Sequence, residues 1–349
     1  MSDNSQFIRA AILYGREDVR VESLPCRPIA PGEVRVRVHA ALTCGTDLKV
    51  YKRGYHARMI VPPAVFGHEF AGIISEVGPE TPVWQVGDRV VAANSAPCGV
   101  CSYCLERREN LCDDLLFLNG AYAQSIIVPA RLVAANLLRL EPGTSFADAA
   151  LTEPLACVAL GAEECQIKRG SRVLILGSGP IGLMFVALAR HAGCLVTSVG
   201  RGSERLETAK RLGAAQTLPA ASDDALPSQP DILSAGPFDV VIEATGKPKV
   251  WEAAVRLVRK GGTVNFFGGC PPNTTVALDT GLIHYSSLRL LASFHHTPRT
   301  IRAALALIEQ GVVQARDFVT SAEPLDRLPE LFRTMAAGNR AVKTLIDVG

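Results

Sequence analysis

The sequence predicts an α/β protein of two domains, in which a barrel-like β-domain precedes a doubly wound parallel sheet. The chain has 349 residues, which is enough for about two domains. Its first third shows the period-two alternation of strands, and from about Arg169 apolar strands alternate with helical stretches. Hydrophobic residues make up 48% and charged residues 20%, so a large core is available and a disordered chain is excluded.

The first domain is expected to consist of short strands. Residues 33–41 alternate valines with polar side chains, which is typical of a half-buried strand. Glycine and proline bound four further short apolar runs, at 8–14, 19–24, 71–77 and 89–92. Several short strands of this kind favour a barrel-like arrangement.

The second domain is expected to be a parallel sheet covered by helices. Strands are predicted at 173–176, 196–199, 240–244, 263–267 and 288–294, and helices at 181–191, 204–212 and 251–258. Residues 219–236 are rich in Ala, Pro, Ser and Asp, which predicts a surface loop. After two helical segments, at 301–310 and 325–335, a strand at 342–347 is expected to return to the first domain. The predicted divisions are 1–153, 154–296 and 297–349.

Charge and targeting signals favour a cytoplasmic protein with a small-molecule partner. Thirty-six Lys and Arg face 34 Asp and Glu without long like-sign runs, so neither nucleic acid nor an anionic membrane is indicated. Met1–Gln6 is polar and lacks a signal-peptide pattern, and no stretch approaches the roughly 18 apolar residues of a membrane span. Ten cysteines in such a chain are expected to be reduced, and clustered thiols then indicate metal binding.

Four cysteines form a C-x2-C-x2-C-x7-C cluster: Cys98, Cys101, Cys104 and Cys112. Four thiolates at this spacing complete a tetrahedral shell, which suits Zn²⁺ and leaves no coordination position for chemistry. The cluster therefore predicts a structural zinc site. An iron–sulfur cluster and thiols without a metal are the alternatives.

A second group of metal-binding residue types begins with Cys44, directly after the 34–38 strand, and continues with His68 and Glu69. A thiolate, an imidazole and a carboxylate are donors that hold a catalytic zinc and leave one position open. Taken singly, a buried Cys or His is more often an ordinary core residue. The residues alone leave both interpretations open.

A glycine-rich turn follows the apolar strand at 174–176. Its G-x-G-x-x-G pattern places Gly177, Gly179 and Gly182 around Pro180 and Ile181, just before a predicted helix. In that context the pattern is the dinucleotide-binding fingerprint of a Rossmann domain, because the glycines allow a tight turn and a close approach of the pyrophosphate.

The end of the next strand favours NADP(H) over NAD(H). An acidic residue normally binds the adenine ribose there, but the chain has Gly200 and Arg201. Arg201 can pair with a 2′-phosphate, aided by Ser203 or Arg205. The alternative is that Arg201 stacks on adenine and that NAD is used. Two later strand ends carry glycines that we expect to contact the cofactor, although turns alone also explain them: Gly246 and Gly268.

The segment Gly67-His68-Glu69-x2-Gly72-x5-Gly78, together with the four-cysteine cluster, resembles the zinc-dependent medium-chain alcohol and polyol dehydrogenases, such as sorbitol and threonine dehydrogenases. The resemblance extends over essentially the whole chain. It implies a GroES-like β-barrel catalytic domain beside the Rossmann domain, two zinc ions per chain, and a homodimer or homotetramer. It also implies zinc ligands at Cys44, His68 and Glu69. Glu153 matches another ligand or an alternative one, or else a helix N-terminal acid.

The resemblance implies hydride transfer between a nicotinamide cofactor and an alcohol or carbonyl compound, such as a secondary alcohol, a polyol or a sugar derivative. Thr46 then relays the substrate's proton, although an N-cap also explains it. Lys49 replaces the histidine that ends the relay in many relatives, which leaves that step open. Two histidines at the end of the last predicted strand, His295 and His296, either line the substrate cleft or belong to a loop or a subunit contact. A zinc-free enone or quinone reductase and a non-catalytic nucleotide-binding protein are the alternative functions.

Overall fold

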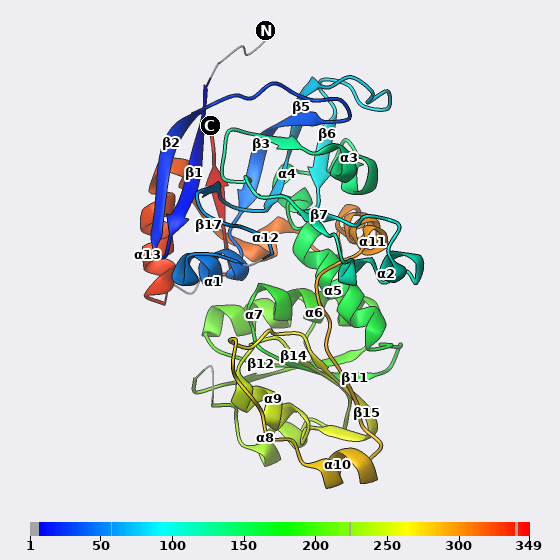
Figure 1. The fold of residues 1–349 in the computed structure, drawn as a ribbon. Helices are drawn as coiled ribbons and strands as arrows, with labels where there is room; N and C mark the ends of the chain where they lie inside the picture. The colour runs from blue at the N-terminus through cyan, green and yellow to red at the C-terminus, as the bar shows by residue number, and fades with distance from the viewer. Residues whose placement is uncertain (1–6, 57, 223–224, 339–340) are drawn as a thin grey trace. The chain divides into compact units, whose positions relative to one another are not determined.

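The computed structural model describes residues 7–56, 58–222, 225–338 and 341–349, so Met1–Gln6 lies outside the described residues (Figure 1). The chain divides into two compact units. The first unit combines residues 1–154 with 296–349, and the second is residues 155–295. The C-terminal segment therefore belongs to the same unit as the N-terminal third of the chain.

The first unit is built mainly of β-strands in two larger sheets. A three-stranded sheet has the order β2-β1-β4, from β1 (Phe7–Gly15), β2 (Asp18–Pro25) and β4 (Ala64–Val65). A seven-stranded sheet has the order β10-β6-β5-β3-β18-β17, and β9 also pairs with β3. Its strands are β3 (Val34–Leu42), β5 (Glu69–Val77), β6 (Arg89–Ala92), β9 (Ser125–Val128), β10 (Leu137–Arg139), β17 (Val319–Pro324) and β18 (Lys343–Asp347).

Short helices and a small ribbon complete this unit. The ribbon pairs β7 (Ser95–Ala96) with β8 (Leu116–Phe117). The helices and 3₁₀ turns are α1 (Gly45–Arg53), α2 (Ser102–Leu105), η1 (Glu109–Leu111), α3 (Ala130–Asn136), α4 (Phe146–Ala149), α11 (Pro298–Glu309), α12 (Ala315–Phe318), η2 (Leu325–Arg327) and α13 (Leu328–Ala336).

Strand β3 organises the core of the first unit. Val34, Val36 and Val38 are buried, while the residues between them are half-buried or exposed, which confirms the alternation expected for this segment. The strand pairs with β5, β9 and β18. The expected returning strand is β18, which pairs antiparallel with the C-terminal end of β3 and is the red strand near the C-terminus in Figure 1.

The second unit is a six-stranded parallel sheet with the order β13-β12-β11-β14-β15-β16. The strands are β11 (Arg172–Leu176), β12 (Leu195–Gly200), β13 (Gln216–Pro219), β14 (Phe238–Glu243), β15 (Val258–Phe266) and β16 (Arg289–Leu291). The helices are α5 (Thr152–Glu164), which starts in the first unit, α6 (Pro180–His191), α7 (Ser203–Arg211), α8 (Gln229–Leu233), α9 (Pro248–Ala254) and α10 (Thr280–Tyr285). The chain winds outward from β11 to β13 and then returns to β14. This order confirms the doubly wound sheet and puts its switch point between β11 and β14.

Several segments differ from the sequence-based expectations, among them the helix predicted at 251–258, which ends at Ala254 and is followed by β15 from Val258. The predicted loop at 219–236 contains helix α8, because the Ser228 side chain caps the backbone N–H of Asp231 and Pro230 suits a first helical turn. Strand β16 ends at Leu291 rather than 294, and Ser293 instead hydrogen-bonds through its hydroxyl to Asn265 and Glu164.

None of the described helices is long and apolar enough to cross a membrane.

Candidate metal centres and nucleotide cradle

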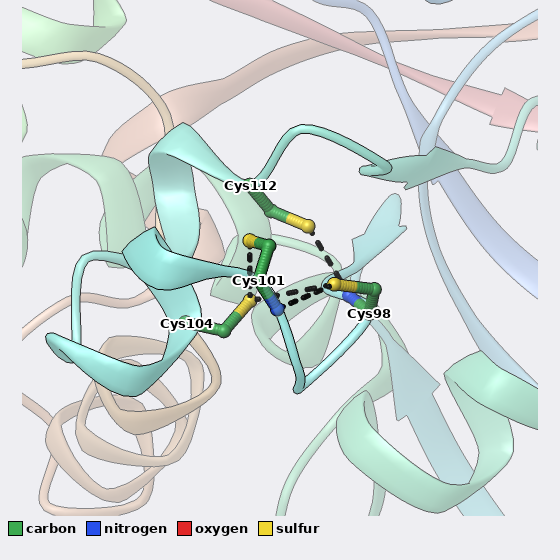
Figure 2. A group of neighbouring side chains, drawn as sticks. All are labelled: Cys98, Cys101, Cys104 and Cys112. Carbon is green, nitrogen blue, oxygen red and sulfur yellow. Dashed lines mark hydrogen bonds between the residues drawn. The ribbon is translucent and has the colours of Figure 1, made fainter.

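The four predicted structural-site cysteines point their sulfur atoms toward one another (Figure 2). All four Sγ atoms lie within 4.8 Å of one another. Tight turns position them locally: Cys101 precedes α2, Cys104 lies within it, and Cys112 follows η1. Four sulfur atoms arranged in this way provide the donor set of a closed tetrahedral zinc site.

Backbone amides prepare this cluster for a metal. The N–H groups of Val100 and Cys101 donate to Cys98 Sγ at 3.5 and 3.4 Å, and they lower the pKa of that thiol to about 6. The N–H of Cys98 donates in turn to Cys112 Sγ at 3.2 Å. The thiolate is the form that binds a metal, so these amides favour the ligating state of Cys98, whereas burial raises the pKa of the Cys104 and Cys112 thiols.

The structure also brings together the ligand atoms of Cys44, His68 and Glu69, again within 4.8 Å of one another. Strand pairing explains the proximity. Leu42 near the end of β3 pairs with Glu69 at the start of β5, so Cys44, just beyond β3, meets His68 and Glu69. The group is buried, apart from a half-buried Cys44. A soft thiolate with an imidazole and a carboxylate fits zinc.

Asp47 orients the imidazole of His68. Its Oδ1 lies 2.9 Å from His68 Nδ1, and both side chains are buried. A proton on Nδ1 that is donated to this carboxylate leaves the Nε2 lone pair for a metal. Sequence analysis missed this role, although Asp47 lies only three residues after Cys44, because a single acid in the first turn of a helix is also explained by the helix dipole.

Lys343 forms a buried ion pair with Glu69. Its Nζ lies 2.7 Å from Oε1 and 2.5 Å from Oε2 of Glu69, and 3.0 Å from the carbonyl oxygen of Thr43. Burial alone would lower the pKa of Lys343, but the Glu69 carboxylate raises it above its ordinary value. Lys343 is the first residue of β18, so the C-terminal strand supplies the cation that neutralises the Glu69 carboxylate.

Glu153 lies in a different group from Cys44. It occupies the first turn of α5, and its Oε1 is 3.9 Å from Nε2 of the buried His296, which in turn is 2.9 Å from Asn94 Oδ1. Burial raises the pKa of Glu153 to about 7. The structure thus groups Glu69, rather than Glu153, with Cys44 and His68.

The two predicted relay residues lie on α1. Thr46 is half-buried in the first turn, and Lys49 is exposed one turn later. The N-cap is Cys44, whose sulfur accepts from the Thr46 N–H at 3.4 Å, so the interpretation of Thr46 as an N-cap is wrong. The Thr46 side chain is therefore not required to cap this helix.

The glycine-rich turn connects β11 to α6 as expected for a nucleotide cradle. Gly177 has a φ of +118°, which favours glycine, and a Cβ on Gly182 would lie 1.8 Å from the carbonyl oxygen of Gly177. Gly179 is the N-cap of α6, which starts with Pro180 and Ile181 and runs for 12 residues. The free N–H groups at such a helix start suit a pyrophosphate.

Ser178 accounts for the glycine at the end of β12. A Cβ on Gly200 would lie 2.2 Å from Ser178 Oγ, 2.4 Å from its Cβ and 2.7 Å from its backbone nitrogen. The same hydroxyl donates to the carbonyl oxygen of Arg201 at 3.0 Å. An acidic residue at position 200 therefore requires Ser178 and its backbone to move, a constraint that sequence analysis did not detect.

The other predicted cofactor residues lie near the ends of parallel strands. Arg201 and Arg205 are half-buried, and Ser203 starts α7. Gly246 and Gly268 follow β14 and β15 and pack against each other: a Cβ on Gly268 would lie 2.3 Å from the Gly246 nitrogen. Close packing of these two loops is sufficient to explain both glycines.

Known proteins share both units. Residues 30–137 match the alcohol dehydrogenase GroES-like domain model, and residues 180–310 match the zinc-binding dehydrogenase model. The chain belongs to the zinc-dependent medium-chain dehydrogenase family. This result confirms the resemblance seen in the sequence, the pairing of a GroES-like domain with a Rossmann domain, and the activity class of a zinc-type alcohol or polyol oxidoreductase.

Individual relatives of this dehydrogenase cover nearly the whole chain. Sorbitol dehydrogenase of Bacillus subtilis is 30% identical over 98% of this chain and 97% of its own length. D-altritol 5-dehydrogenase of Agrobacterium fabrum is 35% identical, with coverages of 88% and 90%. The solved structure of a Sinorhizobium meliloti protein bound to NADP matches this chain with a TM-score of 0.87. The two sequences are 29% identical, and the match covers 98% of this chain and 99% of the other.

Substitutions in the two predicted metal sites should affect the protein differently. Cys101→Ser removes one ligand from a closed site that supports its own loop, so it should lower both the zinc content and the melting temperature. Cys44→Ser should leave a folded but inactive protein that has lost only the other zinc. Metal analysis and thermal unfolding of both variants test this. Full activity of Cys44→Ser, or one zinc per chain in the fully loaded wild type, would contradict the two-site assignment.

Lys343→Met should destabilise the metal-free protein by about 3–5 kcal/mol, because removing one partner of a buried ion pair leaves the other charge uncompensated. The loss should be smaller with zinc bound, since the metal also neutralises Glu69. Lys210→Met is the matched control, because Lys210 forms an exposed pair with Glu207 and should change stability by about 0–1 kcal/mol. Denaturant unfolding with and without a chelator measures both effects. Equal losses in the two metal states would argue against a carboxylate shared by Lys343 and zinc.

Proposed function

We propose that this protein catalyses the reversible NADP(H)-dependent oxidation of a secondary alcohol, polyol or sugar derivative at a zinc held by Cys44, His68 and Glu69. The proposal rests on the convergence of these three donors, whose ligand atoms lie within 4.8 Å of one another. Three protein ligands leave one position of a tetrahedral zinc for the substrate. Relatives named for sorbitol and D-altritol support a polyol-like substrate.

The chain's own residues orient the metal's ligands and move the substrate's proton. When bound, zinc supplies Lewis acidity that lowers the pKa of the alcohol. Thr46 Oγ1 accepts the proton of the substrate hydroxyl and releases its own proton toward solvent. The exposed Lys49, one turn later on α1, stands at the solvent end of this path. Asp47 and Lys343 hold His68 and Glu69 in their ligating orientations.

The cofactor is held by the turn between β11 and α6. Gly177, Gly179 and Gly182 allow the pyrophosphate to approach the start of α6, with Pro180 and Ile181 in its first turn. Arg201, with Ser203 and Arg205, binds the 2′-phosphate, since Gly200 leaves no carboxylate to repel it. Gly246 and Gly268 border the same edge of the sheet. The NADP-bound relative supports this cofactor choice.

Two further features complete the proposal. A second zinc, bound by the four cysteines, stabilises the lobe between β7 and β8. The active form is a homodimer or homotetramer. The edge position of β16 in the parallel sheet supports self-association, because an edge strand carries backbone groups that can pair with another chain.

Thr46→Val tests the proton relay. It keeps the β-branched shape but removes the hydroxyl, so kcat should fall by roughly 10²- to 10⁴-fold while the Kd for the cofactor stays unchanged. Thr46→Ser is the control, because it retains a hydroxyl and should keep most of the activity. Steady-state kinetics on a panel of polyols and cofactor titrations provide the two readouts. An unchanged kcat in Thr46→Val at neutral pH would remove Thr46 from the mechanism.

Arg201→Leu tests the cofactor preference. Loss of a charge-assisted contact with the 2′-phosphate should lower kcat/KM for NADP⁺ by roughly ten- to a hundredfold and leave NAD⁺ almost unaffected. Arg211→Leu, at the C-terminal end of α7, is the control and should change neither value. A wild-type enzyme that already prefers NAD⁺ would refute this part of the proposal.

The metal requirement is tested separately. Full activity of the metal-free protein would favour a zinc-free reductase over the proposed function.

A further inference from the structure

Tyr122 buries a hydroxyl group next to the Cys44–His68–Glu69 site. Its side chain has no solvent exposure, and its hydroxyl lies 2.5 Å from Asp47 Oδ2 and 3.1 Å from the carbonyl oxygen of Leu42. Backbone hydrogen bonds to Phe66 and Ala11 fix the position of the residue. The hydroxyl has a single hydrogen, and the shorter distance indicates that Asp47 receives it.

Asp47 is therefore shared between two donors. One carboxylate oxygen faces His68 Nδ1, and the other accepts from Tyr122. A buried carboxylate needs such partners, because leaving one oxygen without a donor costs free energy and permits rotation of the group. The hydrogen bond to a charged acceptor is also among the stronger kinds. Loss of the Tyr122 hydroxyl would thus act on His68 through Asp47.

The ring of Tyr122 has a separate packing role. It covers Gly67, where φ is +87° and an added Cβ would lie 2.6 to 2.7 Å from ring atoms of Tyr122. It also meets the rings of Phe66 and Phe332 at centroid distances of 5.7 and 6.2 Å. Removing the hydroxyl alone leaves these ring contacts in place, so the two roles can be separated by experiment.

We propose that the hydroxyl of Tyr122 is a positioning group for the catalytic metal site. It holds Asp47 in the orientation that directs Nε2 of His68 toward the metal, in the chain Tyr122–Asp47–His68. Because both oxygens of Asp47 are engaged, this carboxylate is also kept from competing with Glu69 as a ligand. The inference rests on the metal site proposed above.

Tyr122→Phe tests the inference, with Tyr51→Phe as the matched control, since the buried Tyr51 also packs its ring against Phe332, at a centroid distance of 5.4 Å. Zinc release from the holoenzyme to a chelator should show two sites. Tyr122→Phe should weaken the Cys44 site about ten- to a hundredfold and leave the four-cysteine site unchanged. Cobalt substituted at the Cys44 site should show a shifted absorption spectrum. Tyr51→Phe should leave both readouts at wild-type values.

A double-mutant cycle shows whether Tyr122 acts through Asp47. Added to Asp47→Ala, Tyr122→Phe should cause no further loss of zinc affinity. Independent losses in the two backgrounds, or wild-type affinity and an unchanged cobalt spectrum in Tyr122→Phe, would overturn the inference while the proposed function stands. A wild-type protein that binds no metal at Cys44 would instead overturn the proposed function, and this inference with it.

Discussion

The buried ion pair between Glu69 and Lys343 is the interaction on which the candidate active site depends. The two residues come from β5 and β18, and both strands pair with β3. Either charge alone in this environment would cost several kcal/mol, because burial removes its hydration. The site therefore requires the C-terminal strand to be in place, which gives the return of the chain to the first unit a functional meaning.

The two metal centres are assembled in different ways. The four-cysteine lobe depends on local turns, and all its sulfurs come from one short segment, residues 98–112. The Cys44 site depends on strand register and on two buried partners, one from the adjacent helix α1 and one from the C-terminal strand β18. Asp47 orients the imidazole and Lys343 compensates the carboxylate. These contacts leave the ligand atoms of Cys44, His68 and Glu69 within 4.8 Å of one another. Three protein donors leave one coordination position of a tetrahedral zinc ion open for chemistry.

Local patterns in the sequence were sufficient for the fold class, the family and most strands. The alternation in residues 34–38 and the glycine-rich turn after β11 are examples, because neighbouring residues carry the whole signal. Residues that act over long separations had no such signal. A lysine side chain is normally expected in solvent, so nothing in the sequence indicated Lys343 as the partner of Glu69. The two residues meet because β5 and β18 both pair with β3. Ser178 is similar: the missing acid at Gly200 was noted from sequence, but its steric cause was visible only in the structure.

We propose that Glu69, held by Lys343, completes the catalytic metal site with Cys44 and His68. Diffraction from crystals of the zinc-loaded protein, measured at the zinc absorption edge, would locate the bound metal ions. We expect two anomalous peaks per chain: one among the four cysteines, and one bonded to Cys44, His68 and Glu69 with Lys343 still beside the carboxylate. A second peak located at Glu153 and His296 without Glu69, or no second peak, would contradict this proposal.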